Sequence, residues 1–323
     1  MRIAAALLAC AALSAAQPAP SIAQDAYPSR PVRVVIPYPP GGSTDGLARL
    51  IFPRMVESLG QQIVIDNRGG AGGIIGTSLV AKAAPDGYTL LMVFDVHAVN
   101  PYVFKQIPYD TLKDFAPVTL IAISPVFLLV HPSVPASGVQ QFVALAKAKP
   151  GALNFASAGV GSSNHLAGEL FKQVTGTDLT HIAYKGGGPA QTALISGEVQ
   201  LLFGSASFSA PLVRGGRVRA LGVGGGKRNV ALPDVPTFAE QGFGGFEFST
   251  WFGMFAPAGT PAPLIARWQQ ELAKAMRGPD LERRLVGLGV EIVAGPPEDF
   301  DRFFRRESER MGKLVRERNI TVE

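Results

Sequence analysis

Two loops rich in glycine and hydroxyl residues are the parts of this chain best suited to bind a small anion. They are Pro-Gly-Gly-Ser-Thr-Asp at residues 40–45 and Ser-Ala-Gly-Val-Gly-Ser-Ser at residues 157–163. Glycine lets a ligand approach the backbone, and the start of a helix offers free N–H groups at the positive end of its dipole. Two such starts that face each other could hold one carboxylate or phosphate. Alternatively, Ser43 or Thr44 only caps its helix, with Asp45 as an acid of the first turn.

Three further features accompany these loops. His165 lies one turn into the helix after the second loop, where it could contact a ligand or have a structural role. Tyr184 and Lys185 follow a predicted strand and precede three glycines, so Lys185 could meet an anion or lie on the surface. Tyr38 and Trp251 could form the wall of a cleft or belong to a hydrophobic core.

The sequence gives weaker support for nucleotide binding, nucleophilic catalysis or metal binding. The glycines of residues 69–76 follow a strand as in a dinucleotide-binding loop, and Asp95 falls near the place of a ribose-binding acid, but the glycine spacing differs. Residues 224–228 lack the first glycine and the Ser/Thr of a P-loop, and no Gly-x-Ser-x-Gly motif occurs. The histidines show no metal-ligand spacing. We expect no metal, cofactor or catalytic residue; a nucleotide-dependent enzyme using residues 69–76 is the alternative.

The elements that must position these loops alternate between strand and helix. Strands are predicted at residues 33–37, 62–66, 89–94, 154–157, 180–183, 199–203 and 218–223, with helical patterns between most of them. This order predicts an α/β fold with largely parallel sheets, in which ligands bind outside the carboxyl ends of strands. Residues 118–131 and 248–257 are long enough to cross between two lobes, which would place a cleft between them. The C-terminal part is more helical, at residues 261–276 and 297–318.

Length and composition set the remaining limits. The chain has 323 residues, enough for about two domains, and its 47% hydrophobic and 17% charged residues exclude a disordered protein. Arg2, the apolar residues 3–13 and the small residues before position 24 predict an export signal over residues 1–23. The lone Cys10 lies inside it, so the mature chain has no disulfide; lipidation at Cys10 is a weaker alternative. The net charge of +5 is mild, and no nucleic-acid motif accompanies the arginines of residues 297–318.

Several motifs, taken together, resemble one family. In order, the chain carries YPSRPV (27–32), PYPPGGSTD (37–45), DNRGGAGG (66–73), PDGYTLL (85–91), DFAPV (114–118), SAGVGS (157–162), YKG (184–186), LPDVPT (232–237) and APAGTP (256–261). These runs resemble those of the extracytoplasmic solute receptors of tripartite tricarboxylate transporters, often called Bug receptors. The resemblance covers nearly the whole chain after the predicted signal.

The resemblance implies a type II periplasmic-binding-protein fold with two lobes. Each lobe would be an α/β sandwich with a mostly parallel sheet, lobe 1 from residues 25–124 and 250–323 and lobe 2 from residues 125–249. The implied protein is a monomeric periplasmic receptor and not an enzyme. It would capture a small organic carboxylate by cleft closure and deliver it to the membrane subunits of a tripartite transporter, with no nucleic acid and no cofactor. A sensor subunit using the same cleft is an alternative.

The expected ligand-binding residues come from both lobes. They are Tyr38, Gly42, Ser43, Thr44, Asp45, Asp95, Ser157, Gly161, Ser162, Ser163, His165, Tyr184, Lys185 and Ser205. The chain departs from the family pattern at Gly204-Ser205, where many members carry an acid, and at Asp95 and His97, where small or hydroxyl residues are commoner. These departures bear on the ligand, and we expect Asp95 to face the cleft and to select a ligand with a donor group.

Overall fold

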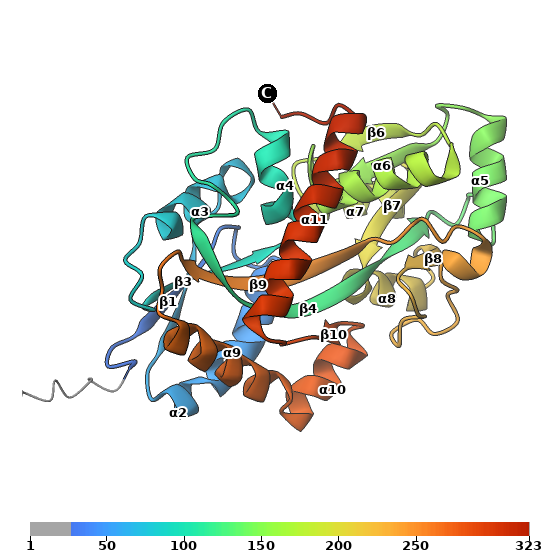
Figure 1. Cartoon of the computed structure of the whole chain (residues 1–323). Coiled ribbons are helices and arrows are strands. Elements are labelled where there is room, and N and C mark those ends of the chain that lie inside the picture. The colour runs from blue at the N-terminus through green and yellow to red at the C-terminus, as the bar shows by residue number, and fades with distance from the viewer. Residues whose placement is uncertain (1–26, 323) are drawn as a thin grey trace, which may run out of the picture.

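The alternation of strands and helices predicted from the sequence is present in the computed structural model, which describes residues 27–322 (Figure 1). The predicted export signal, including Arg2 and Cys10, lies outside the described residues. Within residues 27–322, ten strands are hydrogen-bonded into one sheet. Eight of them follow the order β2-β1-β3-β9-β4-β7-β5-β6, and β8 and β10 lie off this path and pair with β4. We call the part on the β1 side of β4 the first section and the part on the β7 side the second section.

The first section contains the strands nearest the N-terminus together with two from the C-terminal part. β1 pairs in parallel with β2 and β3, whereas β9 pairs antiparallel with both β3 and β4. Its strands are β2 (Ile63–Asn67), β1 (Val32–Ile36), β3 (Thr89–Phe94), β9 (Ser249–Pro257), the first part of β4 (Phe115–Val130) and β10 (Glu291–Ile292).

The second section repeats this arrangement. β5 pairs in parallel with β6 and β7, and β4 adds antiparallel pairings with β7 and β8. Its strands are β7 (Leu201–Ser205), β5 (Asn154–Ser157), β6 (Thr180–Ala183) and β8 (Arg219–Gly224). Both sections are therefore mixed: the parallel pairings predicted from the sequence hold for the outer strands, and the crossing strands bring in antiparallel ones.

Helices cover both faces of each section because the strands alternate their apolar side chains. In the first section, Val34 packs toward α1 (Ser43–Ile51), α9 (Ala262–Met276) and α10 (Pro279–Gly287). Val35 points to the opposite face, which packs against α3 (Ile74–Ala81) and the beginning of α11 (Pro297–Glu317).

In the second section, one face packs against α5 (Val139–Ala148), α6 (Ser163–Thr175) and the end of α11. The other face packs against α7 (Gly187–Ser196) and α8 (Ala206–Arg214). The sequence analysis missed α4 (Val96–Val103) and α10, which are only 8 and 9 residues long; α4 also contains Pro101.

β4 joins the two sections. Its residues up to Pro125 pair with β9, and its residues from Val126 onward pair with β7 and β8. The long α11 runs beside both sections in Figure 1, with Phe304 packed in the first and Leu314 in the second. β4, which covers most of the predicted crossing at residues 118–131, thus runs through both sections.

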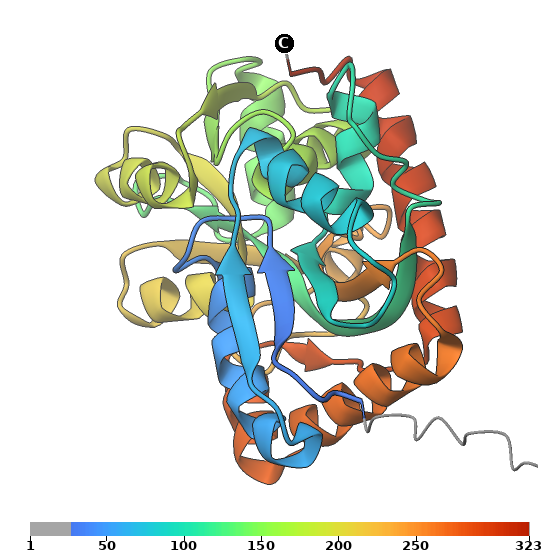
Figure 2. The same cartoon turned by 90° about the vertical axis from the view of Figure 1, so that its left-hand side faces the viewer.

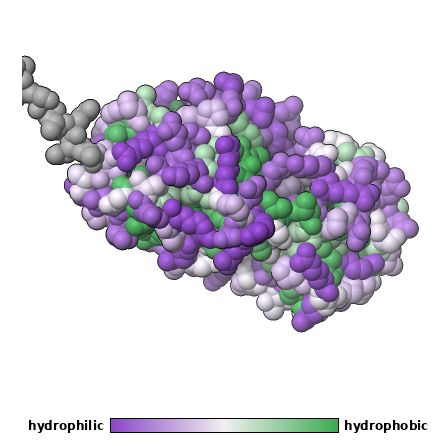
Figure 3. Space-filling view, turned by 90° about the horizontal axis from the view of Figure 1, so that it is seen from below, coloured by the Kyte–Doolittle hydropathy of each residue, from purple (hydrophilic) through white to green (hydrophobic). Residues whose placement is uncertain are grey.

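The surface carries no extended apolar face in the view from below, where hydrophobic residues form small separate areas among hydrophilic ones (Figure 3). No helix among residues 27–322 is long and apolar enough to cross a membrane.

Candidate functional site

A cavity of about 780 Å³ lies between the two sections and is lined by residues from both. The strands β1, β5 and β7 end at its wall, and Figure 2 shows β1 and β2 pointing toward the second section. Its volume is within the range of pockets that hold small organic ligands. We call this cavity the cleft.

Four helices begin at the cleft. α1 and α6 start there after the two loops singled out in the sequence, and α7 and α8 start there after β6 and β7. None of the four has a side-chain hydrogen bond that caps its first turn. Two N–H groups at each of the first two starts have no acceptor within residues 27–322: those of Ser43, Thr44, Ser163 and Asn164. The cleft therefore offers hydrogen-bond donors and positive dipole ends from both sections.

Most of the predicted binding residues line the cleft. The structure brings together Tyr38, Gly42, Ser43, Thr44, Asp45, Gly161, Ser162, Ser163 and Ser205. Five predicted residues are not part of the lining: Asp95, Ser157, His165, Tyr184 and Lys185.

The serine hydroxyls on the lining differ in whether they already donate a hydrogen bond within the protein. Ser162 Oγ donates to the carbonyl of Gly159 at 2.6 Å, and Ser163 Oγ donates to Asp95 Oδ1 at 2.7 Å, so their protons are already used. Ser43 Oγ has no partner among the described residues and is exposed. Ser43 is therefore the serine of the two loops whose hydroxyl is free to donate to a ligand.

Asp95 lies behind the lining and not on it, contrary to the prediction that it faces the ligand. Its side chain is 6% exposed and accepts the Ser163 hydroxyl, which links the end of β3 to the start of α6. Burial raises the pKa of Asp95 to about 7. The side chain joins the two sections at the back of the cleft.

Tyr38 and Asp45 form part of the wall of the cleft. Burial raises the pKa of Tyr38 well above 10.0, so its hydroxyl keeps its proton, and its ring packs on Phe94 with centroids 4.3 Å apart. The hydrogen bond from Arg49 Nε, at 2.9 Å, holds the pKa of Asp45 below its usual range. The same Asp45 oxygen accepts the Gly41 N–H at 2.9 Å, so this acid shapes the first loop.

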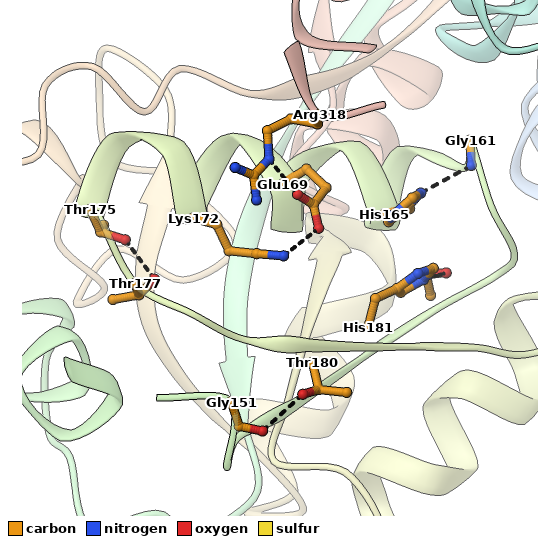
Figure 4. Close-up of polar contacts among 11 residues, drawn as sticks. Gly151, Gly161, His165, Glu169, Lys172, Thr175, Thr177, Thr180, His181 and Arg318 are labelled. Carbon is orange, nitrogen blue, oxygen red and sulfur yellow. Dashed lines mark hydrogen bonds and ion pairs between the residues drawn. The ribbon is translucent and has the colours of Figure 1, made fainter. Parts of the chain in front are cut away.

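A buried cluster under the second loop contains three of the residues predicted to touch the ligand or lie near it (Figure 4). The rings of His165 and His181 stack with centroids 3.8 Å apart. His165 Nδ1 accepts the Gly161 N–H at 3.1 Å, and Ser157 Oγ lies 2.6 Å from His181 Nε2. Burial lowers the pKa of both histidines to about 4, which keeps the imidazoles neutral and lets Nδ1 of His165 accept. Ser157 and His165 thus support the loop from behind.

Removing this support is expected to loosen the loop. His165→Leu would leave the Gly161 N–H without its acceptor, which should lower the free energy of unfolding by about 1–2 kcal/mol. It should also weaken ligand binding, because the neighbouring N–H groups of the loop would be less well placed. Urea unfolding and calorimetric titration measure the two effects. His131→Leu, which removes the acceptor of the Ser133 N–H away from the cleft, is the control and should leave ligand binding unchanged. Unchanged values for both would show that His165 only fills space.

The remaining corrections concern two residues that follow β6 and one residue on β9. Tyr184 Oη donates to Glu198 at 2.7 Å and Lys185 is exposed, and neither side chain is part of the lining of the cleft. Trp251 is 1% exposed and packs against α11, whereas its neighbours Thr250 and Phe252 line the cleft. This follows from strand alternation in β9.

Several lining residues were missed in the sequence. They are mainly apolar or amide side chains and glycines: Phe94, Asn100, Val103, Phe104, Val160, Asn164, Gln191, Leu202, Ser207, Phe208, Thr250, Phe252, Gly70, Gly72 and Gly73. The three glycines belong to the loop considered for a dinucleotide, and its place after β2 was the signal that could have assigned it to the cleft. No group of metal-ligating side chains is present in the described part of the chain.

Comparison with known proteins identifies the family. The model of the tripartite tricarboxylate transporter family receptor matches residues 47–320. The chain is 43% identical over 299 residues to the UPF0065 protein in the tcbD-tcbE intergenic region of Pseudomonas sp. strain P51, covering 92% of this chain and 89% of that protein.

Solved structures of similar proteins support the same family. Rpa4515 of R. palustris with adipate has a TM-score of 0.83 at 37% identity, covering 92% of this chain and 100% of that one. MatC of Rhodopseudomonas palustris with bound malate has a TM-score of 0.79 at 35% identity, covering 90% and 100%. These matches confirm the periplasmic-binding-protein fold predicted from the motifs. The chain belongs to the tripartite tricarboxylate transporter receptor family, whose members are solute-binding receptors and not enzymes.

Proposed function

We propose that this protein is a periplasmic receptor that captures a small organic carboxylate in the cleft and delivers it to a tripartite tricarboxylate-type membrane transporter. The observation that carries the proposal is the set of unpaired N–H groups at the starts of α1 and α6, on opposite sides of the cleft. No lysine or arginine within residues 27–322 lines the cleft, so the donors for an anion are these N–H groups, the free hydroxyls and the amide of Gln191. The malate and adipate of the two relatives support this class of ligand.

Capture occurs by closure of two lobes around the ligand. We place lobe 1 at residues 25–124 and 250–323 and lobe 2 at residues 125–249. The change of pairing partner in β4 between Pro125 and Val126 supports this division, as do lining residues from both sections. The closed monomer then docks on the membrane subunits. A sensor that reads the same cleft remains the alternative.

A ligand screen tests the proposal. The mature chain, from about residue 24, is mixed with malate, adipate, citrate, glutamate, benzoate and nucleotides, and its melting temperature is recorded. A ligand at 100 times its dissociation constant adds about 2.7 kcal/mol to the free energy of unfolding. A shift with one or more carboxylates is expected. A shift with dinucleotides alone would contradict the receptor and favour the enzyme alternative.

Ser43 provides a residue-level test. Ser43→Ala removes a hydroxyl that has no partner in the described protein, so it should weaken carboxylate binding about fivefold, equal to about 1 kcal/mol. Stability should not change, because no internal hydrogen bond is lost. Ser137→Ala, at an exposed serine before α5, is the control. Equal dissociation constants for Ser43→Ala and the unmodified protein, measured by calorimetry, would remove Ser43 from the site.

A further inference from the structure

The side chains that line the cleft limit which carboxylates it can bind. This inference rests on the proposed function. Asp45 is the single charged side chain on its lining within residues 27–322. One of its oxygens is used by Arg49 and the Gly41 N–H, and the other is buried from solvent. Asp95, the other acid nearby, is buried behind the lining and accepts the Ser163 hydroxyl. The cleft thus presents no accessible carboxylate to a ligand ammonium group.

The same lining is rich in apolar side chains from both sections. Phe94 and Phe252 pack in the first section, and Val103, Phe104, Val160, Leu202 and Phe208 pack in or beside the second. Phe104 and Phe208 are only half-buried, and Val160 is 44% exposed. Apolar surface of this kind is stabilised when a ligand covers it and removes it from water.

Two glycines fix the positions of the two half-buried phenylalanines. A Cβ atom on Gly72 would lie 2.8 Å from Cζ of Phe104, and one on Gly204 would lie 2.8 Å from Cδ1 of Phe208. Each ring therefore packs directly on the backbone of its glycine, because a side chain on any other residue at that position would collide with the ring. The rings are held in place before any ligand arrives, which lowers the entropic cost of packing a ligand against them.

We propose that the ligand of this cleft is a monocarboxylate with an aromatic body. Its carboxylate meets the N–H groups at the starts of α1 and α6, and its ring packs against Phe104 and Phe208. Amino acids are rejected because their ammonium group finds no partner. Hydroxylated di- and tricarboxylates bind less tightly because their polar atoms would be set against phenylalanine.

Calorimetric titration of the mature protein tests this with benzoate as the probe and with malate, adipate and glutamate as competitors. Benzoate is expected to bind at least tenfold more tightly than malate or glutamate. Phe208→Ala and Phe104→Ala should each weaken benzoate binding at least tenfold and leave malate binding within about twofold. Phe303→Ala, at a partly buried phenylalanine of α11 outside the cleft, should change neither. If an alanine variant fails to fold, the leucine variant at the same position is used, with an expected loss of threefold or more.

The outcomes separate the two proposals. Binding of malate or adipate without benzoate overturns the aromatic ligand and leaves the carboxylate receptor standing. Benzoate binding that is unaffected at Phe104 and Phe208 also overturns this inference, because the ring would then lie elsewhere. If no carboxylate binds to the folded protein, both proposals fall.

Discussion

Replacing Trp251 by alanine is expected to destabilise the protein strongly, with a loss of about 3–5 kcal/mol in the free energy of unfolding. The indole is 1% exposed, and its ring lies 5.8–5.9 Å from the rings of Phe300, Phe303 and Phe304 on α11. Removing it would leave a cavity where β9 packs against the helix that runs beside both sections.

The measurement is urea unfolding followed by circular dichroism. Ligand affinity at low temperature should be retained, because Trp251 points away from the cleft while Thr250 and Phe252 point into it. Val64→Ala, at a side chain that is 50% exposed, is the control and should change stability by less than 0.5 kcal/mol. A loss of binding in the folded Trp251 variant, with stability unchanged, would mean that the ring belongs to the site after all.

His97→Phe is expected to reduce the sensitivity of the protein to acid. His97 is 0% exposed, neither ring nitrogen has a partner within the described residues, and its neighbours are the rings of Tyr109, Phe115, Phe255 and Phe304. Burial lowers the pKa of His97 from 6.5 to about 3. As the pH falls below 6.5, His97 binds a proton in the unfolded chain but stays neutral in the folded chain. The free energy of unfolding therefore decreases until about pH 3.

The expected size of this effect follows from the pKa difference. Between pH 7 and pH 5, His97 alone should cost about 2 kcal/mol, and His97→Phe should remove that part of the loss. The phenylalanine should also stabilise the protein at pH 7 by about 1 kcal/mol, since a buried unpaired N–H disappears. Tyr109→Phe is the control, because burial raises the pKa of Tyr109 above 10.0 and it does not titrate in this range. If the free energy of unfolding falls equally between pH 7 and pH 5 in His97→Phe and in the unmodified protein, the prediction is contradicted.

The sequence was sufficient to predict the parts of the site that depend on local pattern. The loops at residues 40–45 and 157–163 were identified because glycine and hydroxyl residues between an apolar run and a helical pattern are a local signal. Each loop indeed ends at the start of a helix that lines the cleft. The family motifs then predicted the fold, which the comparisons confirm.

The rest depends on contacts that no local pattern contains. No motif marks Phe104 or Phe208 in the sequence. Phe104 follows α4 and packs on Gly72, which is distant in the chain, whereas Phe208 lies on α8 and packs on the nearby Gly204. The direction of Asp95 could not be predicted, since it follows the end of β3 and its partner Ser163 comes 68 residues later. The pairing of His165 with His181 likewise requires α6 and β6 to pack together.

The path of β4 has a consequence for how the chain acquires its structure during synthesis. The first section holds β1 to β3 from the N-terminal part, but its inner strand β9 and the helix α11 come from the C-terminal part. A ribosome therefore completes every strand of the second section before it makes the strand that pairs with both β3 and β4. The N-terminal segment must wait, incompletely paired, until translation nears its end. A nascent chain released before β9 should thus contain every strand of the second section, while β1 to β3 still lack the strand that joins them to β4.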